Sequence, residues 1–221
     1  MPVETVPFDR RPGSWSVLAT LADADGSAHH PYVQAMCAPK ATTRDLADAI
    51  HLLCALHGRH PGVIDHALSH GPGAVAESWL EEAASAFAEE RALLARLTAA
   101  AGPIPSTPGQ AESEAAVTAQ CRALDMLAQS DRTGCAMGAT IALALDWRAV
   151  RRLLDAAAER AGFGALPSTL PLDAETETLA AALAADPAVE RAMSFGAQQL
   201  LAQHRALWDL ADARKSARDR H

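Results

Sequence analysis

Hydrophobic side chains recur every three or four positions along most of the chain after residue 42, which is the spacing of one face of an α-helix. No segment in this region alternates between hydrophobic and polar residues as a half-buried strand does. The pattern therefore predicts an all-α protein. Breaks rich in Gly and Pro divide it into about seven helices with short connections, which is typical of a compact bundle.

Capping residues indicate where the predicted helices begin and end. Thr42 or Thr43 can cap a first helix that runs to His57. Asp146 is expected to cap the helix that contains "WRAVRRLLDAAAERAG". The other helices are expected at residues 62–70, 74–101, 107–130, 173–185 and from 187 nearly to the C-terminus.

Residues 1–40 differ from the rest of the chain, because Pro, Gly and His are scattered through them and only "SWSVLATLA" has the composition of a short helix. We expect them to form an N-terminal arm packed on a single helical domain at residues 41–221. A chain of 221 residues is long enough for one domain with a sizeable core.

Three ionisable side chains fall on the hydrophobic faces of these predicted helices. His57 continues the hydrophobic stripe of the first helix, Glu90 lies near the middle of the stripe at 74–101, and His204 lies at the centre of the stripe of the last helix. A buried carboxylate must be paired, bound to a metal or protonated. Arg91 and Arg132 are candidate partners for Glu90.

These three side chains are expected to meet in one cavity of the bundle, where helical proteins commonly build their ligand sites. A carboxyl group among apolar side chains favours its protonated form, and histidine titrates near neutrality, so the set can divide into an acid and a base. The sequence thus predicts catalytic roles for His57, Glu90 and His204 in a lyase or isomerase without a cofactor. The expected substrate is small and largely apolar, with an aromatic molecule as one alternative, and it contacts Trp79, Phe87, Trp208 and Cys121.

Two further functions fit the same residues. Two imidazoles and one carboxylate resemble the iron site of a non-haem oxygenase, so His57, Glu90 and His204, together with Glu114 or Asp131, are alternative ligands of iron or manganese. The third function is a non-catalytic scaffold or ligand-binding protein, in which the buried polar groups form internal pairs. An arginine partner for Glu90 would favour this third function.

Two groups of charged residues are assigned to the solvent. Asp48 falls on the outer face of the first predicted helix. The basic residues at the end of the last helix complement the helix dipole and are expected to form a solubilising end: Arg214, Lys215, Arg218 and Arg220.

The composition excludes some partners and indicates a compartment. The net charge of −8 argues against nucleic-acid binding, and no apolar run approaches the ~20 residues of a membrane span. The four cysteines form no C-x-x-C pair, so we expect reduced thiols and a cytoplasmic protein. The expected partner is a small-molecule ligand. A homodimer is compatible with the sequence. No P-loop, G-x-G-x-x-G or G-x-S-x-G motif is present.

Several segments resemble an uncharacterised bacterial family of all-α proteins with no assigned activity: "LCALHGRHPGVIDHA", "PSTPGQ" and "SDRTGCAMGA". The resemblance covers most of the chain after about residue 40 and transfers no functional residues.

The helix order also allows a haem-oxygenase-like arrangement with His57 as axial ligand. The glycines of "GCAMG" predict close helix packing or close approach of a flat ligand.

Overall fold

The computed structural model describes residues 13–70, 73–164 and 167–220, which contain nine α-helices, one short 3-10 helix and no strand. The predicted all-α fold is thus confirmed. Helices α3 to α9 are the seven expected after residue 40, and α1 and α2 precede them. The α-helices are α1 (Ser14–Asp25), α2 (Pro31–Cys37), α3 (Thr43–His57), α4 (Val63–Ser69), α5 (Ala74–Ala101), α6 (Gln110–Ala128), α7 (Cys135–Arg160), α8 (Asp173–Leu183) and α9 (Pro187–Asp219).

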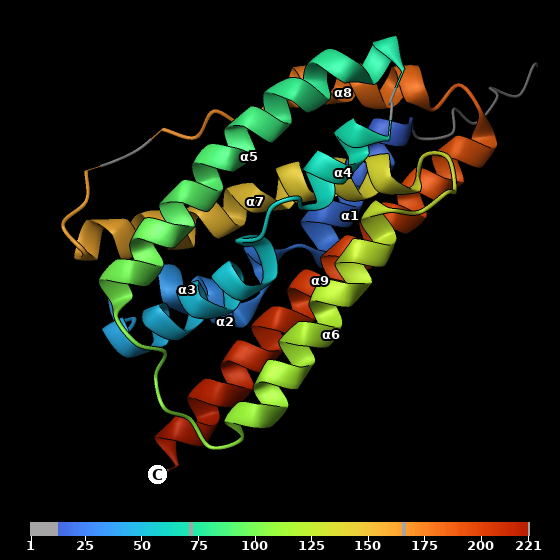
Figure 1. Cartoon of the computed structure of the whole chain (residues 1–221). Helices are drawn as coiled ribbons and strands as arrows, with labels where there is room; N and C mark the ends of the chain where they lie inside the picture. The colour runs from blue at the N-terminus through green and yellow to red at the C-terminus, as the bar shows by residue number, and fades with distance from the viewer. Residues whose placement is uncertain (1–12, 71–72, 165–166, 221) are drawn as a thin grey trace, which may run out of the picture.

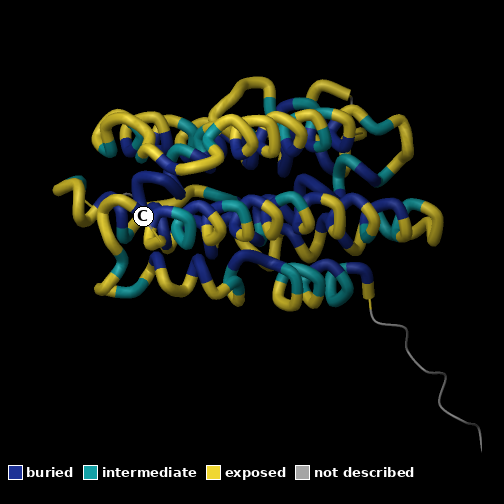
Figure 2. The backbone as a smooth tube through the Cα atoms, turned by 90° about the horizontal axis from the view of Figure 1, so that it is seen from below, coloured by how far each residue is buried: buried dark blue, intermediate teal, exposed yellow. Residues whose placement is uncertain are grey.

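The long helices α7 and α9 form the centre of the bundle (Figure 1). Helix α7 packs along α9, α6 lies along another side of α9, and α5 covers α3 and α4. Buried residues follow the inner faces of the helices while the outer faces are exposed (Figure 2). The core is therefore continuous from α1 to α9, and polar side chains on the inner faces of α3, α7 and α9 face one another inside it.

Two glycines allow α7 and α9 to approach closely. A Cβ atom on Gly138 would lie 1.9 Å from the carbonyl oxygen of Met193, and one on Gly196 would lie 2.0 Å from that of Cys135. These distances are far shorter than any van der Waals contact, so only glycine fits at either position. Close helix packing is thus the role of the glycine at the end of "GCAMG".

Helix α7 is longer than expected. The prediction that Asp146 caps a helix is wrong, because α7 begins at Cys135 and Asp146 lies in its middle, with only 3% of its surface exposed. The cap predicted for the first helix is confirmed: Thr42 Oγ1 accepts a hydrogen bond from the backbone N–H of Asp45 at 3.1 Å.

One face of the C-terminal end of α9 is buried against the start of α3, so the expected solubilising end is wrong for Arg214 and Arg218, whereas Lys215 is half-buried and Arg220 is exposed. Arg218 forms ion pairs with Asp45 at 2.7 Å and with Asp48 at 2.5 Å, and Arg214 pairs with Asp48 at 2.7 Å. Asp48 is fully buried, so its assignment to the outer face is wrong as well. The pattern within α3 could not show that α9 brings two guanidinium groups to that face.

The described part of the predicted N-terminal arm packs on the centre of the bundle. Helix α1 contacts α7, α8 and α9, and α2 contacts α7 and α9. Leu18 and Tyr32 are almost completely buried there. The turn between the two helices, at Ser27, therefore enters the core, where it reaches the site described below.

Candidate functional site

Two histidines from the ends of the sequence meet inside the bundle. His57 lies in the last turn of α3 and His204 near the middle of α9, and both are buried. Their Nε2 atoms are 2.8 Å apart, although the residues are separated by 147 positions. Each continues the hydrophobic face of its helix, and the packing of α3 on α9 joins them.

Asp146 of α7 extends this pair into a chain of three ionisable side chains, which we call the Asp146–His204–His57 relay. The Nδ1 atom of His204 lies 2.5 Å from Oδ2 of Asp146. The side chains of His204 and Asp146 are each only 1% exposed. The relay therefore crosses the core from α7 through α9 to α3.

The turn after α1 holds the carboxylate end of the relay. Ser27 donates its backbone N–H to Oδ1 of Asp146 and its hydroxyl to Oδ2, both at 2.6 Å. The indole N–H of Trp208 in turn donates to Ser27 Oγ at 2.7 Å. Burial alone would raise the pKa of Asp146, but its bonds with His204 and Ser27 outweigh burial and lower that pKa below its ordinary value. Asp146 is thus an ionised acceptor.

The ionised carboxylate fixes the proton positions along the relay. Because Asp146 only accepts hydrogen bonds, Nδ1 of His204 carries a proton and donates it to Oδ2. In the form with one proton on each ring, Nε2 of His204 is then the acceptor and Nε2 of His57 the donor. Nδ1 of His57 is left as the basic nitrogen of the relay, and it bonds to none of the described residues.

Aromatic rings surround the imidazole of His57. The rings of Trp147 and Phe87 stand edge-on to it, with centroids 5.3 and 6.2 Å away. Burial, followed by the nearby charges of His204 and Arg91, holds the pKa of His57 well below its ordinary value of 6.5. His57 is therefore neutral at neutral pH and available to accept a proton.

Glu90 lies beside this site but outside the relay. Its carboxylate accepts hydrogen bonds from Arg151 at 2.7 Å, from the indole of Trp147 at 3.1 Å and from the hydroxyl of Ser168 at 2.8 Å. Within the described residues it bonds to neither histidine. The expected partners Arg91 and Arg132 are not the ones observed, since Arg151 pairs with Glu90. Glu90 therefore positions Trp147, whose ring packs on His57.

A narrow cleft opens at the His57 end of the relay. It has a volume of about 20 Å³ and lies between the α3–α4 connection and α6, where His57, Phe87, Val63 and Leu124 line it. A space of this size holds about one water molecule. Arg59 and Asp125 also line the cleft and form an exposed ion pair at 3.0 Å. With the ion pair of Arg59 and Asp125 in place, only a very small group can reach His57.

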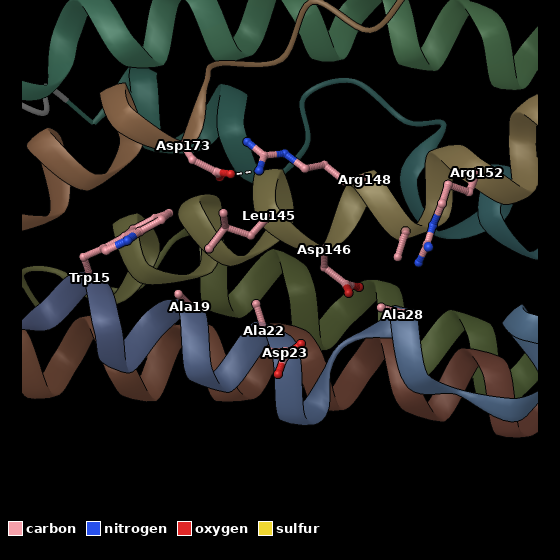
Figure 3. Close-up of a pocket in the computed structure, with 11 residues that line it drawn as sticks. Trp15, Ala19, Ala22, Asp23, Ala28, Leu145, Asp146, Arg148, Arg152 and Asp173 are labelled. Carbon is pink, nitrogen blue, oxygen red and sulfur yellow. Dashed lines mark hydrogen bonds and ion pairs between the residues drawn. The ribbon is translucent and has the colours of Figure 1, made fainter. Parts of the chain in front are cut away.

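A larger pocket lies beside the Asp146 end of the relay (Figure 3). Its volume is about 460 Å³, and α1 and α7 form its two long walls with Asp173 of α8 above them. Asp146 lines this pocket, although its carboxylate is shielded from solvent. The relay therefore lies between a water-sized cleft and a pocket that fits a small organic molecule.

The four predicted substrate contacts occupy different places. Phe87 lies against His57, as described above. Trp208 donates to Ser27, which in turn bonds to Asp146 of the relay, and it stacks on Tyr32. Trp79 donates its indole N–H to Thr176 of α8 at 3.2 Å, and Cys121 lines a separate pocket on α6.

The residues proposed as additional metal ligands do not reach the histidine pair. Glu114 is exposed on α6, where it accepts a hydrogen bond from Gln110 at 2.8 Å, and Asp131 is exposed in the loop after α6. In the part of the chain that the structure describes, no three His, Cys, Asp or Glu side chains are grouped so that they could hold a metal ion. The described donors thus do not fit the iron or manganese alternative.

Sequence reasoning missed Asp146, Ser27 and Arg151. Asp146 has hydrophobic residues three and four positions away on both sides, which indicates an inward face once α7 is treated as one helix. Arg151 shows the same pattern, because Trp147 precedes it by four positions and Leu154 follows it by three. Ser27 carries no signal, because it lies in a turn whose position depends on the packing of α1.

Comparisons with known proteins place the chain in a family without assigning an activity. The sequence model of a group described as "Family of unknown function (DUF6975)" matches residues 22–219, so the chain belongs to this family. No curated protein and no solved structure matches the chain. No helix of the described residues has both the length and the apolar character needed to span a membrane.

Proposed function

We propose that this member of the DUF6975 family is an acid–base enzyme of the lyase or isomerase type, in which His57 exchanges protons with a small, largely apolar substrate. The Asp146–His204–His57 relay supports this proposal most strongly. Its three side chains are bonded end to end at 2.5 and 2.8 Å inside the core. Burying ionisable groups costs free energy, and a purely structural core is commonly as stable with apolar residues.

The relay supplies a route for one proton. Nδ1 of His57 accepts a proton from a C–H or O–H group of the substrate, while its Nε2 proton passes along the hydrogen bond to Nε2 of His204, the two nitrogen atoms being 2.8 Å apart. The substrate is left as an anion, His57 is again neutral, and His204 becomes an imidazolium. The reverse transfer returns the proton to another atom of the substrate or to a leaving group, as an isomerase or lyase requires.

Asp146 makes this transfer favourable without taking up a proton. The imidazolium formed on His204 lies 2.5 Å from a carboxylate that Ser27 holds in place with two hydrogen bonds. A buried carboxylate in this position orients the imidazole and stabilises its charged form. Asp146 and Ser27 are therefore positioning residues, whereas His57 is the catalytic residue of this proposal.

Access to His57 requires only a local opening. The ion pair of Arg59 and Asp125 joins the α3–α4 connection to α6 at the cleft, and its side chains are 55% and 36% exposed. An exposed ion pair contributes about 0.2–1 kcal/mol, so breaking it costs little. The apolar walls of the cleft, including Phe87 and Leu124, favour a substrate whose reacting end is apolar.

Deuterium exchange at carbon tests the proposal without knowledge of the substrate. Wild-type protein is incubated in D₂O with enolisable ketones such as cyclohexanone and phenylacetone, and loss of the C–H signals is followed by NMR. We expect exchange that falls about 100-fold or more in His57→Gln, as for loss of a general base. His70→Gln, which changes an exposed histidine, is the control. Equal rates in wild type and His57→Gln for every probe would contradict the proposal.

A non-catalytic ligand-binding protein is the second candidate, and the ion pair of Glu90 with Arg151 at 2.7 Å favours it. This pair shows that at least one of the predicted catalytic groups has an internal partner. The two candidates differ in what His57→Gln changes. In a binding protein the variant changes stability alone, whereas in the enzyme it removes exchange from a protein that remains folded by circular dichroism.

We also infer a cytoplasmic location. All four cysteines are free thiols: Cys37, Cys54, Cys121 and Cys135. A reducing compartment keeps thiols in this state. The net charge of −8 supports a small-molecule ligand rather than a nucleic acid.

A further inference from the structure

We infer that the pocket between α1 and α7 binds a small organic carboxylate with an apolar body, and that Arg152 is its counter-ion. This pocket is separate from the cleft at His57, so the inference does not depend on the proposed acid–base reaction. Its volume of about 460 Å³ lies within the range of pockets that hold small-molecule ligands.

The walls of the pocket are shaped for an apolar body. Four alanines from α1, the turn after it and α7 line a channel in this pocket: Ala19, Ala22, Ala28 and Ala149. Trp15, which is half-buried, lies at one end of this channel, and Arg152 lies at the other (Figure 3). A ligand with its charge at Arg152 can thus place a ring or short chain along the alanines toward Trp15.

Most charged residues of the pocket already have partners. Arg148 forms an ion pair with Asp173. Asp23 lies 3.2 Å from His29, and Asp146 accepts from His204 within the relay. The carboxylates of the wall are thus engaged, and they leave no counter-ion for a further cation.

Arg152 is the exception. None of the described residues forms an ion pair or hydrogen bond with its guanidinium group. Its charge acts on Cys37, but burial is the largest influence on that thiol and raises the pKa of Cys37 above its ordinary value, so the thiol is neutral at neutral pH. An exposed guanidinium at the end of an apolar channel is therefore available for a carboxylate, which it can bind through two N–H groups.

The wall also limits the charge of the ligand. Three carboxylates line the pocket against two guanidinium groups: Asp23, Asp146 and Asp173 against Arg148 and Arg152. Arg152 can neutralise one negative charge of a ligand, and the second charge of a dianion would find no free cation among the described residues of this wall. The pocket therefore favours a monocarboxylate over a phosphate monoester.

The test uses 3-phenylpropionate as the probe, its uncharged amide as the isosteric control and phenyl phosphate as the dianion. Binding is followed in ¹H–¹⁵N spectra, where the chain gives four indole signals and Trp15→Phe identifies that of Trp15. We expect 3-phenylpropionate to shift the Trp15 signal and to leave the other three unchanged. The amide and phenyl phosphate should each bind at least tenfold more weakly.

Substitutions separate the pocket from other basic surfaces. Arg152→Gln should weaken binding of 3-phenylpropionate at least tenfold, and Arg122→Gln, at an exposed arginine of α6, should leave it unchanged. Ala22→Leu, which fills the channel, should abolish the shift in a protein with an unchanged circular dichroism spectrum. Equal binding of the amide, an unaffected Arg152→Gln variant or no shift of Trp15 would each overturn the inference. His57→Gln should bind the probe normally, so failure of the acid–base proposal leaves this result intact.

Discussion

The Nε2 atoms of His57 and His204 lie 2.8 Å apart, and this contact is the only link between the surface cleft and the buried carboxylate of Asp146 that the described residues provide. Two imidazoles in such a position share one proton between their facing nitrogens. Each ring of this pair is then neutral, so one added proton creates an imidazolium in the core, and two added protons would place two positive charges side by side. The acid–base state of the pair is therefore coupled to the stability of the fold.

The free energy of unfolding should fall as the pH is lowered below about 6.5. Burial lowers the pKa of His57 in the folded state, so below its ordinary value of 6.5 the unfolded chain binds a proton that the folded chain does not. The expected slope is about 1.4 kcal/mol per pH unit for one proton. Urea titrations between pH 7 and 5 measure it. His57→Gln should remove this slope, whereas exposed His70→Gln should retain it.

Replacing the acceptor of the relay should destabilise the protein at neutral pH. Asp146→Asn keeps the size of the side chain but removes the charge that accepts three hydrogen bonds, from His204 and from Ser27 twice. Bonds to a charged group contribute about 1.5–3 kcal/mol, so we expect a loss of about 2 kcal/mol or more in chemical denaturation. Glu159→Gln, at an exposed position of the same helix, should cost less than 1 kcal/mol. A neutral effect of Asp146→Asn would contradict the ionised relay.

Glu90 should be important for stability. Glu90→Leu removes the buried carboxylate that accepts from Arg151, Trp147 and Ser168, and breaking a buried pair of this kind typically costs about 3–5 kcal/mol. Adding Arg151→Met should recover part of that loss, because the guanidinium that paired with Glu90 in the core is then gone as well. Glu82→Leu, at an exposed position of α5, should stay within about 0.5 kcal/mol. Strict additivity of the two buried substitutions would show that the pair is not coupled.

The buried charges at the end of α9 lead to a prediction about Asp48. Asp48→Leu removes the carboxylate that both Arg214 and Arg218 contact, so thermal unfolding should reveal a loss of about 3–5 kcal/mol. Lys215 lies between the two arginines in sequence but is 34% exposed and pairs with Asp219. Lys215→Met should therefore change stability by less than about 1 kcal/mol. A similar loss of stability in Asp48→Leu and Lys215→Met would contradict the expectation that the buried arginine pairs contribute more than the exposed lysine pair.

A single methyl group should disrupt the contact of α7 with α9. Gly138→Ala would place a Cβ atom 1.9 Å from the carbonyl oxygen of Met193, and backbone atoms must move to remove the clash. Overpacking of this kind costs about 1–3 kcal/mol or more. Gly13→Ala has nothing within 4 Å of the added atom and should be close to neutral. The difference in melting temperature between the two variants measures the effect.

The sequence predicted those parts of the structure that depend on one helix at a time. His57 and His204 were identified because each continues a hydrophobic stripe, and such stripes are set by the geometry of a single helix. Asp146 was missed because it was treated as a cap, since Asp is common at helix starts and two glycines precede it. The helix nevertheless continues through it from Cys135.

Other features depend on how helices pack and could not be predicted in this way. Asp48 lies on the face of α3 opposite its hydrophobic stripe, and this face is buried because the end of α9 packs against it. The pairing of Glu90 with Arg151 likewise joins α5 to α7, and no spacing within either helix indicates it. Ser27 enters the site because the turn after α1 reaches α7.

The positions of the relay residues along the chain determine when the site can form during synthesis. Ser27, His57, Asp146 and His204 are contributed by four separate stretches, and the bonds between them join residues 58 to 147 positions apart, with Ser27 and Trp208 separated by 181. No portion of the nascent chain that ends before α9 can hold this set of contacts. The titration behaviour of His57 therefore reports on the completed molecule, because a chain that ends before α9 lacks the imidazole of His204 that His57 contacts.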